Sequence, residues 1–105
     1  ISRHEIKCNI DDVVRVSSQL LKPHGKMFMV HRPSRLAEIF ACMRTYGLEP
    51  KRMRMVYPFA DKAPNLVLLE AVKGGGPQLN VDPPLIVYEK SGEYTREVLQ
   101  IYGKI

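Results

Sequence analysis

The sequence predicts a layered α/β fold in which helices connect parallel strands and the final strand runs antiparallel to them. Three observations lead to this class. Apolar residues recur at helical spacing in residues 10–21 and again in residues 36–43. Short apolar runs bounded by glycine and proline follow these segments, as strands do. Residues 58–64, which join the last two long strands, are too few for a crossover helix, so those strands are expected to be antiparallel.

The first predicted helix begins after Asn9, a favoured N-cap residue, and Asp12 lies where it can complete the cap. Pro23 and Gly25 end this helix. Residues 26–31, KMFMVH, then form a short apolar run that suits a strand buried on both faces, as in a parallel sheet. The apolar face expected on the helix contains Ile10, Val13, Val14, Val16, Leu20 and Leu21.

The second helix is predicted from Pro33, which fits a first helical turn, and from a single apolar stripe. Gly47 can adopt the left-handed conformation that ends a helix, and Leu48 can then fold back on the helix. The stripe consists of Leu36, Ile39, Phe40 and Met43.

Residues 51–57, KRMRMVY, alternate between basic and apolar side chains over most of their length. A period of two predicts a strand with one basic face, and we expect this strand at the edge of the sheet. Residues 65–73, NLVLLEAVK, form a more apolar strand. Residues 74–76 are three glycines without the GKS or GKT pattern of a phosphate-binding loop, so they indicate a flexible turn. An extended segment with two prolines follows, and Thr95 is expected to cap a short last helix.

Composition limits the class of protein. A chain of 105 residues forms one domain at most. Its 45% hydrophobic and 26% charged residues are globular values, which excludes a wholly disordered chain. The 16 Lys and Arg residues outnumber the 11 Asp and Glu residues, and the net charge of +5 favours a polyanionic partner such as nucleic acid. No run of about 18 apolar residues is present, so no membrane partner is expected.

Cys8 and Cys42 are the only cysteines, and no CxxC motif is present. We therefore expect neither a disulfide framework nor a zinc site, and reduced thiols fit a cytoplasmic protein. His4, His24 and His31 have no metal-ligand spacing, so no metal ligand is assigned.

Four strings of residues carry a resemblance to a known family. They are HRPxRLAEI at 31–39, GLEPKR at 47–52, EAxKGG at 70–75 and PPLxVY at 83–88. With these strings the chain resembles the C-terminal part of the bacterial tRNA adenine-N6 methyltransferases, which act on an adenine in the anticodon loop of a valine tRNA. The likeness covers nearly the whole chain, from Arg3 to Tyr102.

The resemblance implies a Rossmann-like class I S-adenosylmethionine-dependent methyltransferase fold, whose last strand is inserted antiparallel between the two strands before it. Residues 26–31, 51–57 and 65–73 would then be the fifth, sixth and seventh strands. Residues 1–105 would be the C-terminal portion of one methyltransferase domain, with tRNA as partner and S-adenosylmethionine as cofactor of the parent protein.

The sequence also departs from the family pattern. The family's Gly-rich cofactor loop, its acidic residue after the second strand and its Asn-Pro-Pro-Tyr motif do not occur here. No catalytic or cofactor-binding residue is therefore assigned, and we expect the 105 residues alone to be inactive.

Seven basic residues are candidate RNA contacts, in three groups: Arg3 and His4; Arg32 and Arg35; Lys51, Arg52 and Arg54. The first group would follow the missing motif in a loop near the target base, or would be solvated charges at a frayed terminus. The second group lies at a strand end and a helix start, where anions bind in α/β sheets. Alternatively, Arg35 pairs locally with Glu38. The third group would track phosphates, or would protect an edge strand from aggregation.

Two other functions stay open at this level. A basic α/β module without catalysis would bind RNA by itself in a salt-sensitive manner. A purely structural fragment would self-associate through an exposed sheet edge or through exposed helix faces. Tyr88, Tyr94 and Tyr102 would stack on bases in the RNA-binding case, or would fasten the C-terminal segment to the core.

Overall fold

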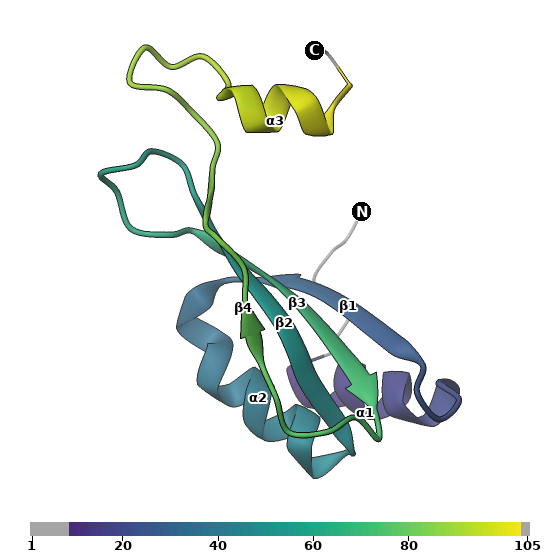
Figure 1. The fold of residues 1–105 in the computed structure, drawn as a ribbon. Coiled ribbons are helices and arrows are strands. Elements are labelled where there is room, and N and C mark those ends of the chain that lie inside the picture. Colours follow the sequence, from purple (N-terminus) through teal and green to yellow (C-terminus); the bar gives the residue numbers. More distant parts are fainter. Residues whose placement is uncertain (1–8, 104–105) are drawn as a thin grey trace, which may run out of the picture.

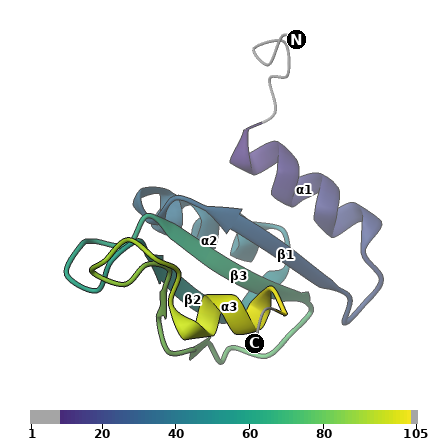
Figure 2. The ribbon, with the colours of Figure 1, turned by 90° about the horizontal axis from the view of Figure 1, so that it is seen from above.

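Two helices lie on one face of a mixed five-stranded sheet in the computed structural model, which describes residues 9–103 (Figure 1). A third helix lies on the opposite side of the sheet (Figure 2). Within the described residues, no helix is long and apolar enough to cross a membrane. The elements are α1 (Ile10–Leu20), β1 (Lys26–His31), the 3₁₀ turn η2 (Pro33–Arg35), α2 (Leu36–Thr45), β2 (Leu48–Tyr57), β3 (Leu66–Lys73), β4 (Asn80–Val81), β5 (Leu85–Ile86) and α3 (Arg96–Ile101).

Strand β3 lies between β1 and β2 and is antiparallel to both, so β1 and β2 are parallel to each other. This confirms the predicted order, in which a final antiparallel strand is inserted between two helix-connected parallel strands. The pairing register places Phe28, Glu70 and Arg52 in one row across the three strands. The next row contains Val30, Leu68 and Arg54.

The expectation that residues 51–57 form an edge strand is wrong. Strand β2 pairs with β3 on one side, and on the other side it pairs in parallel with β4 and with β5. The proline-containing segment is extended, as predicted, and it runs parallel to β2 and pairs with that strand at residues 52–53 and 56–57. Arg52 therefore lies in a paired part of the strand and not on an open edge.

The core lies between the helices and the inner face of the sheet, the face that α1 and α2 cover. Local sequence signals define the ends of the helices. Asn9 accepts a hydrogen bond from the backbone N–H of Asp12 in a capping box at the start of α1, and Gly47, with φ of 77°, ends α2. The largest fully buried side chains of the core come from α1, α2 and the sheet and are Val14, Ile39, Met43, Leu48 and Val67.

The outer face of the sheet, opposite α1 and α2, is open at β1. Phe28 is 71% exposed and Val30 is 60% exposed, while Met27 on the other side of the same strand is buried. The prediction that residues 26–31 are buried on both faces is therefore wrong, because no described element covers β1 on its outer face. Part of the apolar face predicted for α1 is also open to solvent, namely Val13, Val16 and Leu20.

Candidate nucleic-acid interface

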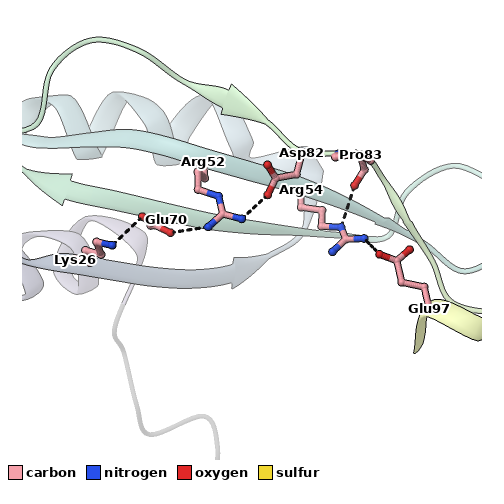
Figure 3. Close-up of polar contacts among 7 residues, drawn as sticks. All are labelled: Lys26, Arg52, Arg54, Glu70, Asp82, Pro83 and Glu97. Atoms are coloured by element: carbon pink, nitrogen blue, oxygen red, sulfur yellow. Dashed lines mark hydrogen bonds and ion pairs between the residues drawn. The ribbon is translucent and has the colours of Figure 1, made fainter. Parts of the chain in front are cut away.

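Arg52 lies on the outer face of the sheet between two carboxylates (Figure 3). Its Nη2 donates to Oδ2 of Asp82 at 2.8 Å, and its Nη1 is 3.5 Å from Oε1 of Glu70. The hydrogen bond to Asp82, and then the negative charges of Asp82 and Glu70, raise the pKa of the Arg52 guanidinium above its ordinary value. The arginine is therefore firmly charged, and its charge is balanced within the chain.

Arg54 is held by the same C-terminal segment two residues further along β2. Its Nε donates to the backbone oxygen of Pro83 at 2.9 Å, and its Nη2 pairs with Oε2 of Glu97 in α3. This arginine thus joins β2 to α3, and it is one reason why α3 lies on the outer side of the sheet (Figure 3). The third member of the group, Lys51, donates to the backbone oxygen of Gly76 at 3.0 Å.

Glu70 is the centre of this arrangement. Its side chain is only 13% exposed and lies between Arg52 and Lys26, whose Nζ is 3.8 Å from Oε2. A carboxylate so placed on the middle strand fixes charges on both neighbouring strands. The sequence offers one signal for it, since Glu70 is the only acidic residue within the apolar run of β3. Asp82 and Glu97 give no such signal, because their partners are far away in the sequence.

A pocket of about 210 Å³ opens on the outer face beside these charges. Phe28 and Leu68 form its apolar wall, and Arg52, Arg54, Glu70 and Asp82 form its charged wall. The charged wall holds two cations and two anions. In this state the pocket offers a polar surface without an excess of positive charge.

Arg32 and Arg35 lie together at the carboxyl end of β1. Arg35 pairs with Glu38, with Nε at 2.7 Å from Oε1, which is the local pairing that the sequence allowed. The backbone N–H of Arg32 donates to Nδ1 of His31 at 2.9 Å, so this ring nitrogen already accepts a hydrogen bond from the neighbouring residue. Among the described residues the Arg32 side chain makes no ion pair, and it lines a shallow pocket with Pro64 and Asn65.

The remaining candidates, Arg3 and His4, lie outside the described residues. The structure thus brings Arg52 and Arg54 together on one face and leaves Arg32 and Arg35 at the carboxyl end of another strand. Lys73 has a role that sequence reasoning missed. Its Nζ donates to the backbone oxygens of Ser18 and Leu21, at the end of α1.

A row of aromatic rings joins four separate segments above the carboxyl end of β2. The ring centroids of Phe59 and Tyr88 are 5.4 Å apart, those of Tyr88 and Tyr94 are 5.4 Å apart and nearly parallel, and those of Tyr94 and Tyr102 are 6.1 Å apart. Such contacts stabilise the placement of the C-terminal segment. Tyr94 and Tyr102, at the outer end of the row, keep exposed surface.

Neither a metal-ligand cluster nor a Gly-rich cofactor loop is present in the part of the chain that the structure describes. Within residues 9–103 there is no group of three or more His, Cys, Asp and Glu side chains that would hold a metal. The glycines 74–76 follow β3 and lead into an extended segment, and the next helix along the chain, α3, begins only at Arg96. They therefore do not fit a Gly-rich cofactor loop that leads into a helix.

Comparison with solved structures shows that this arrangement of helices and strands occurs in a known protein. The fold is similar to the crystal structure of a predicted O-methyltransferase, protein Atu636 from Agrobacterium tumefaciens, with a TM-score of 0.81 and 24% sequence identity. This is a methyltransferase-like fold. The match covers 90% of this chain and 46% of that chain, so the present chain spans about half the length of its structural relative. No family model matches the sequence, and no curated protein matches it.

Proposed function

We propose that the chain is the C-terminal portion of one S-adenosylmethionine-dependent methyltransferase domain that modifies the N6 amine of an adenine in tRNA. The observation that carries the proposal is the position of β3, antiparallel between the parallel strands β1 and β2, within a fold shared with a predicted methyltransferase. The substrate part of the proposal rests on the resemblance of the four strings, from HRPxRLAEI to PPLxVY, to the tRNA adenine-N6 enzymes.

Uncovered apolar surfaces support a larger domain. Strand β1 pairs with β3 alone among the described residues, so its other edge offers free backbone groups. Phe28 and Val30 on the outer face are exposed next to that edge, and so is Leu20 on α1. A further strand and further helices, supplied by the rest of such a domain, would bury these groups. The cofactor-binding residues of the proposed domain would belong to that part.

The proposed contribution of these 105 residues is to complete the sheet and to position RNA. Arg32 and Arg35 lie at the carboxyl end of β1, where open α/β sheets bind ligands. Together with Lys51, Arg52, Arg54 and the terminal residues Arg3 and His4, they are the proposed RNA contacts. An enzyme that methylates a base amine must hold the base outside its stack, and positioning of the amine is then a large part of the rate enhancement.

The test is to read the coding sequence immediately upstream of Ile1. An Asn-Pro-Pro-Tyr motif about 20 residues before it, preceded by a Gly-rich strand–loop–helix unit, is the expected result. The complete protein should then transfer labelled methyl groups from S-adenosylmethionine to unmodified tRNA, while the 105 residues alone should not. A start codon at this point, with no partner chain that carries these motifs, contradicts the proposal.

A second candidate function is that of a basic RNA-binding module without catalysis. The net charge of +5 and the two arginine groups favour it. It predicts that the 105 residues alone bind RNA with an affinity that falls steeply with salt. Absence of RNA binding at low salt removes this candidate.

A further inference from the structure

We propose that Arg52 and Arg54 form a binding site for phosphodiester groups on the outer face of the sheet, and that the chain's own Asp82 and Glu97 occupy this site when no polyanion is bound. The inference deepens the proposed function, because RNA is the phosphodiester ligand that it requires. It accounts for the pairing of two proposed RNA contacts with carboxylates of the same chain.

The two arginines are arranged as a pair. They are two residues apart on one strand and point to the same face, which places their backbones about 6.6 Å apart at 3.3 Å per strand residue. Each presents a planar guanidinium, the group that matches carboxylates and phosphates by the same fork of N–H donors. A carboxylate on each arginine is therefore a chemical stand-in for a phosphate oxygen.

Each guanidinium has one contact that orients it and one that is exchangeable. For Arg52 the orienting partner is Glu70, whose side chain is 13% exposed and is shared with Lys26. For Arg54 it is the backbone oxygen of Pro83, which accepts from Nε at 2.9 Å. Nη2 of Arg52 is then the atom that pairs with Asp82, and Nη2 of Arg54 is the atom that pairs with Glu97.

The exchangeable contacts are the more solvated ones. The side chains of Asp82 and Glu97 are 29% and 49% exposed, whereas that of Glu70 is 13% exposed. Each of these pairs has one solvent-exposed partner, and such pairs are weak, contributing up to about fivefold to an equilibrium constant, so a polyanion can displace them. The backbone need not move far, because the N–H of Asp82 remains bonded to the oxygen of Met53 at 2.9 Å.

The site is tested by measuring the fluorescence anisotropy of a labelled single-stranded RNA oligonucleotide titrated with the 105-residue chain and three double variants. Asp82→Asn with Glu97→Gln frees the arginines and keeps the shapes of both side chains. Asp61→Asn with Glu89→Gln is the matched control, since it changes the net charge equally at exposed acids that make no ion pair in the described part of the chain. Arg52→Lys with Arg54→Lys keeps the charge and removes the fork.

The freed variant should bind the oligonucleotide at least about fivefold more tightly than the matched control does, and the lysine variant should bind more weakly than the parent chain. Equal affinity of the freed variant and the control overturns the inference, and so does unchanged affinity of the lysine variant. Thermal melting of each variant confirms that the fold is retained, and the freed variant tests the site even if the lysine variant fails to fold.

A parallel titration with inorganic polyphosphate separates this inference from the proposed function. If polyphosphate competes for the site and depends on Asp82 and Glu97 in the same way, the anion site stands even when the complete protein methylates no tRNA. If the complete protein methylates tRNA but the freed variant gains no affinity for either polyanion, the inference fails and the proposed function stands.

Discussion

The hydroxyl of Tyr46 donates to both carboxylate oxygens of Asp11, at 2.9 and 3.0 Å, and so ties the end of α2 to the first turn of α1. Near the other end of α1, the hydroxyl of Ser18 donates to the backbone oxygen of Tyr46 at 2.6 Å. The two helices are therefore joined by polar contacts at both ends of α1, outside the apolar core.

This contact predicts a specific loss of stability in alkali. The hydrogen bond to Asp11 is the main cause that raises the pKa of Tyr46 above its ordinary value of about 10. Because the folded pKa is the higher one, the stabilisation is fully present below pH about 10 and is lost as the pH rises through the folded pKa. Urea unfolding between neutral and alkaline pH should show this decline in the parent chain. Tyr46→Phe should show a smaller decline, and an identical decline in both contradicts the contact.

Lys73 predicts a second effect on stability. Replacing it by methionine removes the donor to the oxygens of Ser18 and Leu21 at the end of α1. The free energy of unfolding should fall by about 1–2 kcal/mol, because two carbonyls lose a charged hydrogen-bond donor. Lys62→Met, at an exposed loop position, is the control and should change the free energy of unfolding by less than about 0.5 kcal/mol. Equal effects of the two substitutions would remove the assigned role of Lys73.

The two faces of the sheet predict opposite outcomes for large-to-small substitutions. Ile39 is fully buried under the inner face, so Ile39→Ala should cost about 2–5 kcal/mol of unfolding free energy. Phe28 is 71% exposed, so Phe28→Ala should cost less than about 0.5 kcal/mol in a dilute sample of this chain. Chemical denaturation at low protein concentration measures both. A large cost for Phe28→Ala would show that something covers the outer face in solution.

The open edge of β1 predicts concentration-dependent self-association of the isolated chain. Among residues 9–103 no strand pairs with that edge, its backbone groups lie beside exposed Phe28 and Val30, and such edges recruit other strands. Sedimentation velocity should show a larger species as the concentration rises, and Val30→Lys should reduce it. A compact monomer that melts cooperatively at high concentration refutes this prediction.

Local features could be predicted from the sequence because their causes are local. The cap at Asn9, the left-handed Gly47 and the cap at Thr95 each depend on a few neighbouring residues, and all three are present. The stripe of α2 buries Ile39 and Met43 as expected. The antiparallel direction of β3 was also predictable, because the short connection before it excludes a crossover, whereas its insertion between β1 and β2 was implied by the family resemblance alone.

The outer face could not be predicted in the same way. The pairing of Arg52 with Asp82 depends on a register between segments that are 30 positions apart, and no local pattern encodes that register. The apolar run of β1 indicated burial on both faces, yet exposure depends on which elements cover the strand. The same limitation explains the incorrect edge assignment of β2, since two short strands of two residues each give almost no sequence signal.

The central position of β3 also has a consequence for synthesis on the ribosome. Strands β1 and β2 share no pairing with each other, and each depends on β3, which is the last of the three along the chain. A nascent chain therefore cannot join the two parallel strands until residue 73 has left the exit tunnel, and the pairing of β2 with β4 and β5 follows later still. Such late, non-local pairing slows folding and leaves apolar strands open to wrong partners for as long as translation takes.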